Sequence, residues 1–330
     1  MSKVLLVKSD SVLSSSGYTI IEHDRNLKKV KRVASLIDKK YSPFSKCALT
    51  RRLFRAEITG LYELADGSMI AIAKKGLFKR SVQGGDFHKV FAMPRGSKPL
   101  NLCILKNSHI FFGEYFQNVE KGEVHVYGSK DNGASWQVVY SFPAGNINHV
   151  HGLFLDPYIE HMWVLTGDRE NECIIGYTDD EFQTLHEVFR GGQEYRSCHL
   201  FFYEDFIVYA TDSQYIQNEI RIIDRKTLKI ATVVQIQGSA IKGGQSGNIS
   251  YLSTTIEPSE VNTPKASHLW YTKDGKHWVD VISYKKDCLP ALLQFGSIEF
   301  PQHKAPITDR IYFSGRALKG LDGESTYIEI

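Results

Sequence analysis

Short apolar runs, rather than a helical period, dominate the pattern of hydrophobic and polar positions along this chain. The runs at 68–73 (SMIAIA), 109–113 (HIFFG) and 161–166 (HMWVLT) are each bounded by turn residues, as are 206–211 (FIVYAT) and 310–314 (RIYFS). Runs of this length that are rich in β-branched and aromatic residues are typical of single buried strands. The pattern therefore predicts an all-β protein.

The buried runs recur in units of about 40–50 residues, a period that is typical of propeller blades. Five units are expected, at 56–92, 100–143, 149–188, 192–235 and 237–284. A last blade would combine 290–330 with strands from the N-terminal 35 residues, and this pairing would close the ring without an open sheet edge. The sequence thus predicts a single six-bladed β-propeller domain over 1–330. Seven blades are the alternative, with 3–35 as a blade of its own, and 37–56 is expected to be irregular or to hold a short helix.

A turn motif with a conspicuous aspartate occurs three times. It reads GSKDNGASW at 128–136 and YTKDGKHW at 271–278, with a degenerate copy, YTDDEF, at 177–182. In such a turn the Asp carboxylate can accept hydrogen bonds from backbone N–H groups, and the Gly can adopt a positive φ. Both full copies are followed by a predicted strand. We therefore expect the motif to mark the turn between the third and fourth strands of a blade.

These turns match, or nearly match, the Asp-box pattern Ser/Thr-x-Asp-x-Gly-x-x-Trp. Together with the blade count they resemble the sialidase-like superfamily of BNR-repeat β-propellers, and 149–227 looks like a group of uncharacterised bacterial glycosyl-hydrolase-like propellers in it. The resemblance implies a protein that acts on or binds carbohydrate. Sialidases also carry a Phe/Tyr-Arg-Ile-Pro string that supplies a carboxylate-binding arginine. The nearest string here, Phe54-Arg55-Ala56-Glu57, lacks the proline.

Strand direction within a blade predicts where a site would lie. The starts of the first strands and the ends of the second strands meet at one end of the ring, opposite the aspartate turns, and ligands usually bind on such loops near the axis. The candidate acid and base groups at that end are Glu114, Asp168, Asp212 and His151. The candidate substrate-binding residues are Arg55, Arg196, Asn218, Arg316, Tyr115 and His149.

Three hypotheses follow from this set. The favoured one is a glycoside hydrolase-like enzyme acting on an acidic or complex bacterial glycan, because paired carboxylates supply an acid and a base and arginines bind carboxylates. The second is a non-catalytic propeller that binds a glycan or a protein. The third and weakest is a metal-dependent polysaccharide lyase in which His149 and His151, two apart on one strand face, ligate an ion with Asp168. Outside that third hypothesis we expect no cofactor and no metal.

Composition and charge narrow the classes further. The 40 basic residues nearly balance the 37 acidic ones, so charge gives no argument for nucleic-acid binding. The N-terminal apolar run, 4–7, is too short for a signal-peptide core, and no stretch is long enough to span a bilayer. A cytoplasmic protein is therefore expected, with export by a non-classical route as the alternative. The five cysteines are odd in number and contain no CxxC pair, which predicts free thiols; the oligomeric state stays open.

Overall fold

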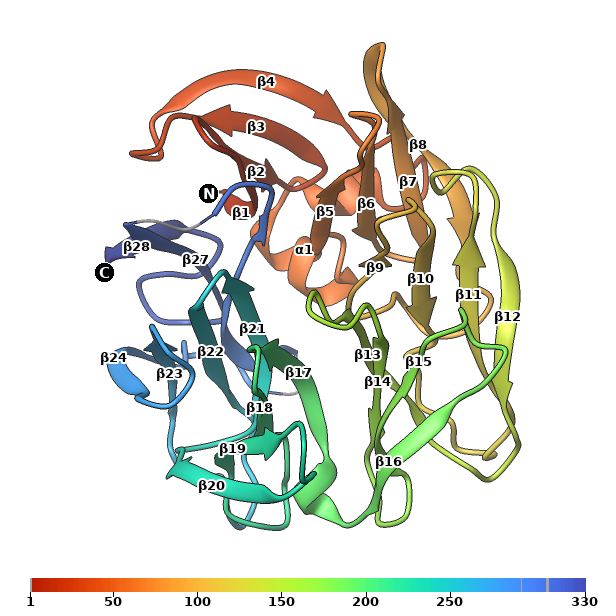
Figure 1. The fold of residues 1–330 in the computed structure, drawn as a ribbon. Helices are drawn as coiled ribbons and strands as arrows, with labels where there is room; N and C mark the ends of the chain where they lie inside the picture. The colour runs from red at the N-terminus through yellow and green to blue at the C-terminus, as the bar shows by residue number, and fades with distance from the viewer. Residues whose placement is uncertain (1, 292, 307–308) are drawn as a thin grey trace.

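The computed structural model describes residues 2–291, 293–306 and 309–330. Its strands form antiparallel sheets arranged around a ring, so that the chain travels once round a central axis and both ends lie on the same side (Figure 1). In the sheets between β5 and β20 the first strand lies toward the axis and the fourth lies at the periphery. This is a β-propeller arrangement, as the apolar pattern predicts.

The first half of the ring contains three sheets. One consists of β1 (Lys3–Val7), β2 (Val12–Ser16), β3 (Thr19–His23) and β4 (Lys29–Ser35), with the short β26 (Gln302–His303) added parallel to β1. The next is β5 (Gly60–Glu63), β6 (Met69–Ala73), β7 (Gly76–Ser81) and β8 (Gly84–Ala92). The third is β9 (Cys103–Ile104), β10 (Ile110–Gly113), β11 (Val124–Ser129) and β12 (Gln137–Phe142).

The second half of the ring continues in the same way. Two four-stranded sheets are β13 (His149–Leu155), β14 (Met162–Gly167), β15 (Cys173–Thr178) and β16 (His186–Gly191), then β17 (Ser197–Phe202), β18 (Phe206–Thr211), β19 (Glu219–Asp224) and β20 (Ile230–Gln235). A seven-stranded sheet joins β21 (Ala240–Ser246), β22 (Ile249–Ile256), β23 (Ala266–Thr272) and β24 (Val279–Lys285) to β25 (Gly296–Glu299), β27 (Arg310–Arg316) and β28 (Ser325–Glu329).

The expected closure of the ring by the N-terminal strands needs a correction. Strands β1–β4 do not complete a blade with the C-terminal segment but form a four-stranded sheet of their own. From the C-terminal segment, only the two-residue strand β26 joins this sheet. Strand β25 instead pairs with β22, and this pairing joins the C-terminal strands to the sheet of β21–β24. The N-terminal segment supplies four consecutive short strands of its own, which is enough for an antiparallel sheet without a C-terminal partner.

The segment between the first two sheets is irregular, as predicted for 37–56. It holds a 3₁₀ turn, η1 (Ser42–Ser45), and one short helix, α1 (Ala48–Phe54), which ends at Arg55 in the left-handed conformation (φ 52°). A second 3₁₀ turn, η2 (Gln193–Tyr195), precedes β17. None of the helices in the described ranges is long and apolar enough to cross a bilayer.

The three aspartate turns lie between third and fourth strands, where the motif places them, and the two full copies share one hydrogen-bonding scheme. Asp131 Oδ1 accepts hydrogen bonds from the backbone N–H groups of Ala134 (3.0 Å) and Ser135 (2.8 Å). Gly133 has φ 79°, and the indole of Trp136 donates to its carbonyl oxygen at 3.2 Å. The turn at 272–278 repeats these contacts around its own Asp, Gly and Trp.

The hydrophobic core lies between neighbouring sheets rather than at the axis. One cluster joins Phe111 and Phe142 of the third sheet to Val150 and Val164 of the fourth, and all four side chains are fully buried. Burying each such side chain contributes about 1.5–3 kcal/mol. The apolar faces of the sheets are used for packing against neighbouring sheets. The edges of the inner strands, and the polar residues at their ends, therefore lie toward the axis.

Candidate functional site

Two histidines occupy the start of the inner strand β13. Both side chains are buried, and the register of β13 against β14 shifts between Val150 and Gly152. This β-bulge leaves His151 as the extra residue of the ladder. Bulges re-aim side chains and are frequent beside functional sites. Here the bulge brings the rings of His149 and His151 together, with centroids 4.9 Å apart.

The hydrogen bonds of the two imidazole rings determine the orientation of each ring and which of its nitrogens carries hydrogen. His149 Nδ1 donates to the carbonyl oxygen of Phe116 at 2.9 Å, and His151 Nδ1 donates to that of Ser197 at 2.9 Å. Both Nδ1 atoms therefore carry hydrogen, and the two Nε2 atoms face one another at 3.1 Å. Two lone pairs at this distance repel, so the contact is favourable only with a proton or a cation between them.

Asp168, the residue after β14, lies against both histidines. Its carboxylate is 3.3 Å from His151 Nε2 and 3.4 Å from His149 Nε2, and it accepts a hydrogen bond from Asn148 Nδ2 at 2.7 Å. Arg196 approaches the same carboxylate at 3.0 Å. Although burial alone would raise its pKa, the contacts with the two imidazoles, once their Nε2 atoms hold a proton, keep the pKa of Asp168 well below its usual value. The group is thus an anion at neutral pH.

The next blade contributes a cation, a thiol and a second carboxylate. Arg196 follows η2, and its guanidinium lies between Asp168 and Asp212, 3.7 Å from the latter. The thiol of Cys198 donates to Asp212 Oδ2 at 3.2 Å, and burial raises the pKa of that thiol. Asp212 Oδ1 is buried and has no hydrogen-bond partner among the residues that the structure describes. One ligand atom each from His151, Cys198 and Asp212 lies within 4.8 Å of the others.

A further carboxyl group, Glu257, completes this set, although sequence reasoning missed it. It follows β22 directly, as Asp168 follows β14 and Asp212 follows β18, so the same strand-end rule would have found it. Gln214 Nε2 donates to its Oε1 at 2.5 Å. Burial, reinforced by the negative charge of Asp212, raises its pKa to about 7. Cys198 and Asn148 were missed as well, because neither matches a motif.

The site opens into a cavity that runs along the inner strands. The cavity has a volume of about 670 Å³. Its walls include His151, Cys198 and Lys242, near the starts of three inner strands, and Glu299, the last residue of β25. Three of these inner strands, β13, β17 and β21, have a register shift near their first residues. The bulges thus gather side chains of successive blades at one mouth of the channel.

The structure brings six of the ten predicted site residues into or beside this cluster, but not the other four. Besides His149, His151, Asp168, Arg196 and Asp212, the ring of Tyr115 packs 4.2 Å from His149, centroid to centroid, and is partly exposed. Glu114 instead pairs with Arg95 and accepts from the N–H of His125 at 2.9 Å, so its carboxylate belongs to a separate set of contacts.

The remaining three predicted residues have other surroundings. Asn218 is buried and holds the loop after β18, accepting from Ser213 N at 2.7 Å and donating to Asn262 at 2.9 Å. Arg55 is exposed at the end of α1. Arg316, at the end of β27, pairs with Glu57 at 2.7 Å and with Glu299 at 3.2 Å. Sequence alone could not separate these cases, since all occupy strand ends or loops at the same side of the ring.

The cluster has the dimensions and the charge of a divalent-metal site. Ligand atoms about 2.0–2.1 Å from a tetrahedral ion are about 3.3 Å apart, and the contacts between His149, His151 and Asp168 measure 3.1, 3.3 and 3.4 Å. Asp168 and Asp212 flank the guanidinium of Arg196, and Glu257 lies within electrostatic range of all three groups. A divalent cation would balance the negative charge of these side chains. Asp212 Oδ1, which has no partner among the described residues, is a further oxygen beside it.

Comparisons with known proteins identify the fold of this chain but assign it to no family. No family model matches the chain, and no curated protein matches it. A structure of virginiamycin B lyase from Staphylococcus aureus with quinupristin has 11% identity and a TM-score of 0.58, covering 96% of this chain and 92% of that one. A chain of the mitotic checkpoint complex has 10% identity and a TM-score of 0.56, covering 99% and 89%. The WD40 β-propeller domain of Doa1 has 10% identity and a TM-score of 0.52, covering 91% and 87%.

These solved structures have different functions, so they support the β-propeller fold alone. No match bears on the resemblance to sialidases, on an Asp-box family or on glycoside hydrolysis. The function therefore has to be argued from the side chains at the channel mouth.

Proposed function

We propose that this protein is a metal-dependent enzyme of the lyase type that acts on an acidic glycan at the mouth of the channel. The observation that carries the proposal is the 3.1 Å contact between the Nε2 atoms of His149 and His151, whose Nδ1 atoms both donate to backbone carbonyl oxygens. Histidines that bind a metal through Nε2 commonly donate their other N–H in this way. The weakest of the three sequence hypotheses thus becomes the leading one.

The protonation states of the carboxyl groups favour an elimination reaction. They do not favour hydrolysis, which would need a pair of carboxyl groups. A glycoside hydrolase needs one carboxyl group that holds a proton and a second that acts as base or nucleophile. Asn148 and Arg196 keep Asp168 ionised, and Glu114 is engaged by Arg95. Glu257 is the one carboxyl group of this set whose pKa is raised, to about 7, which suits a residue that accepts and returns a proton near neutral pH.

The proposed reaction is β-elimination next to a carboxylate. His149, His151 and Asp168 would hold the ion, which would supply Lewis-acid stabilisation of negative charge on the substrate. Glu257 removes the proton from the carbon beside the carboxylate, the C–H electron pair forms the C=C bond, and the C–O bond to the next sugar breaks. The departing oxygen takes up a proton, which the hydroxyl of Tyr115, a partly exposed residue whose ring packs against His149, would donate. No co-reactant is consumed.

The experiment is a turnover assay on polygalacturonate and alginate, read from the ultraviolet absorbance of the unsaturated uronate. We expect activity that a chelator abolishes and that added Zn²⁺ or Mn²⁺ restores. His149→Gln and Glu257→Gln should each lose at least about 10²-fold in kcat, the usual cost of losing a general acid–base group. His277→Gln, in an exposed turn, is the matched control and should keep full activity.

Activity that survives chelation would contradict the metal-dependent mechanism. Binding of these polymers without turnover, unaffected by Glu257→Gln, would contradict an enzyme and favour a non-catalytic glycan-binding propeller.

A further inference from the structure

A buried thiol next to the proposed metal centre takes no part in the proposed reaction. Cys198 is the second residue of the inner strand β17, and the register of β17 against β18 shifts between Ser197 and Leu200. Like His151 on β13, Cys198 therefore lies in a β-bulge, which re-aims side chains. Both residues line the central cavity. The thiol is thus within reach of a small ion that enters the cavity.

Three side chains at this point form a compact set of possible metal ligands. One ligand atom each from His151, Cys198 and Asp212 lies within 4.8 Å of the other two. A point about 2.8 Å or less from all three atoms therefore exists, close to the length of a metal–thiolate bond, about 2.3 Å. The three residues are 1%, 5% and 3% exposed, so bulk water competes little for these atoms.

The carboxylate of Asp212 is incompletely paired. Its Oδ2 accepts a hydrogen bond from the Cys198 thiol at 3.2 Å and lies 3.7 Å from Arg196, whose guanidinium is shared with Asp168. Its Oδ1 is buried and has no partner within the described ranges. A buried oxygen without a partner is costly, and a cation beside it would remove that cost. Asp212 therefore favours a cation at this position.

This second position and the proposed metal centre share one atom, Nε2 of His151. Nδ1 of the same ring donates to the carbonyl oxygen of Ser197 at 2.9 Å, so Nε2 is the nitrogen available to a metal. A neutral imidazole nitrogen has a single lone pair and binds a single ion. An ion at the second position therefore removes His151 from the proposed metal centre.

The two positions differ in the chemistry of their ligands. The proposed metal centre offers two imidazoles and a carboxylate, whereas the second position offers one imidazole, a carboxylate and a thiol. Thiolate ligands favour soft ions such as Cu⁺ and Cd²⁺, whereas imidazole and carboxylate ligands also suit the harder Mn²⁺. The two positions thus have different preferred ions.

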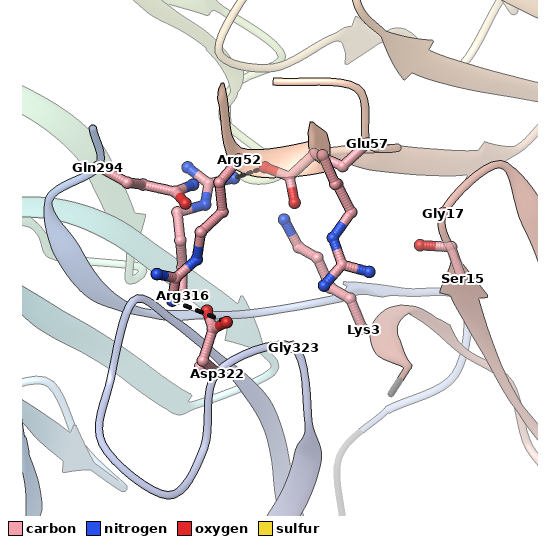
Figure 2. Close-up of a pocket in the computed structure, with 11 residues that line it drawn as sticks. Lys3, Ser15, Gly17, Arg52, Glu57, Gln294, Arg316, Asp322 and Gly323 are labelled. Carbon is pink, nitrogen blue, oxygen red and sulfur yellow. Dashed lines mark hydrogen bonds and ion pairs between the residues drawn. The ribbon is translucent and has the colours of Figure 1, made fainter. Parts of the chain in front are cut away.

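A second charged pocket, between the two ends of the chain, is by contrast filled by its own ion pairs (Figure 2). Arg316 pairs with Glu57 at 2.7 Å. Arg52 pairs with Asp322, also at 2.7 Å. Because both of these carboxylates already have a cationic partner, this pocket offers no comparable position for a metal ion.

We infer that His151, Cys198 and Asp212 form a second metal position for soft ions, and that an ion bound there empties the proposed metal centre. When the ion binds, the S–H bond of Cys198 breaks, the proton passes to the buffer, and a sulfur electron pair forms the bond to the ion. No oxidation state changes. The metal position stands by itself, whereas its consequence, inhibition of turnover by soft ions, rests on the proposed function.

The test is titration of the chelator-treated full-length protein with Cd²⁺, followed by the ultraviolet charge-transfer absorption of the Cd–thiolate bond. We expect an absorption that saturates with a single tightly bound ion, and Cys198→Ser should lose it. Cys103→Ser is the matched control and should keep it, because Cys103 is a buried thiol that lines the same cavity but belongs to neither ligand group in the described ranges. The exposed Cys47 and Cys288 give the same background in all three proteins.

Asp212→Asn tests the carboxylate without removing the thiol. The absorption at saturation should remain, but the affinity for Cd²⁺ should fall by about tenfold or more, because an amide oxygen carries no charge. Thermal unfolding of each ligand-free variant shows whether it is folded. The second position is overturned if folded Cys198→Ser absorbs as the parent does, if Asp212→Asn keeps the parent's affinity, or if the parent shows only the background of the exposed thiols.

Competition with Mn²⁺, measured by electron paramagnetic resonance of the free ion, tests the shared atom. Equimolar Cd²⁺ should release Mn²⁺ from the parent, and Cys198→Ser should need a large excess. Cd²⁺ bound through Cys198 without release of bound Mn²⁺ would contradict a shared His151. If Cd²⁺ binds through Cys198 but the protein binds no Mn²⁺ and has no turnover, the second position stands and the proposed enzyme mechanism fails.

Discussion

At the scale of single residues, the site depends on small distances around the two histidines. Gly167 ends β14 opposite His149, and a Cβ there would lie 2.6 Å from Cε1 of His151 and 3.2 Å from Cγ of Arg196. Real Cβ atoms essentially never make a contact as short as the first. A side chain at position 167 would therefore displace the His151 ring from the position in which its Nε2 faces His149.

Gly167→Ala should weaken metal binding more than it weakens the fold. We expect metal affinity to fall by about 10–100-fold, the range seen when the supporting contacts of metal ligands are disturbed. Metal titration monitored by calorimetry, with thermal unfolding measured in parallel, checks this. Gly122→Ala is the control, since a Cβ at Gly122 meets nothing closer than 3.9 Å. Equal metal affinity in the parent and in Gly167→Ala would contradict a metal site that depends on the position of the His151 ring.

Glu257 should make the ligand-free protein less stable as the pH rises. Its folded-state pKa is about 7 against a usual value of 4.5, so between these values the folded protein holds a proton that the unfolded chain has released. The free energy of unfolding must then fall as the pH rises from about 4.5 to about 7.

Glu257→Gln should remove that dependence and stabilise the metal-free protein by about 1–2 kcal/mol above pH 7. Urea denaturation at several pH values, in the presence of a chelator, measures the difference between the parent and the variant. A difference that does not change with pH would show that Glu257 titrates normally.

At the scale of elements, the sequence predicts the positions of the strands and turns well. The run at 206–211 coincides with β18, and the runs at 109–113 and 161–166 differ from β10 and β14 by a single residue at their ends. Periodicity and turn residues act locally, so they are visible in the sequence. The β-bulge at His151 is not, because the register of two strands depends on which side chains meet across them.

The aspartate turns are predicted to stabilise the fold without affecting the site. Hydrogen bonds from the Ser135 hydroxyl and from backbone N–H groups lower the pKa of Asp131 to about 2. Asp131→Ala should lower the free energy of unfolding by about 1 kcal/mol at neutral pH. Because the folded pKa is depressed, this contribution is present above pH about 3.8 and is lost as the pH falls toward 2.

Chemical denaturation of Asp131→Ala beside the neighbouring exposed variant Lys130→Ala measures this effect. Metal affinity should be the same in both variants, since the turn lies at the opposite end of the blade from His149. A loss of metal binding in Asp131→Ala would mean that the two ends of the sheet are coupled.

At the scale of the whole molecule, contacts between residues far apart in the sequence join the two ends of the chain and close the ring. The backbone N–H of Val4 donates to Ser314 Oγ at 2.9 Å, and the hydroxyl of Tyr312 donates to the carbonyl oxygen of Arg25 at 2.6 Å. The sequence shows that the ends must meet but not which strands pair. That is why the N-terminal sheet was expected inside the last blade. The polar cluster, likewise, is assembled from several blades that no sequence motif connects.

Tyr312→Phe tests the junction between the ends. The variant keeps the buried ring and removes only the hydroxyl, so the free energy of unfolding should fall by about 1 kcal/mol, the usual net value of one hydrogen bond. Tyr327→Phe, in the adjacent strand β28, is the control because the Tyr327 hydroxyl makes no hydrogen bond in the described ranges. Tryptophan fluorescence and far-ultraviolet circular dichroism should report the same midpoint for each variant. Separate midpoints would show that the ring does not unfold as one unit.

The central claim is a metal ion between His149 and His151, and anomalous X-ray diffraction tests it most directly. Crystals of protein purified without chelator, or soaked in Zn²⁺, should show one anomalous peak about 2.0–2.2 Å from both Nε2 atoms and from an oxygen of Asp168. The absence of a peak after soaking, with the Nε2 atoms still 3.1 Å apart, would contradict the claim and assign the contact to a shared proton.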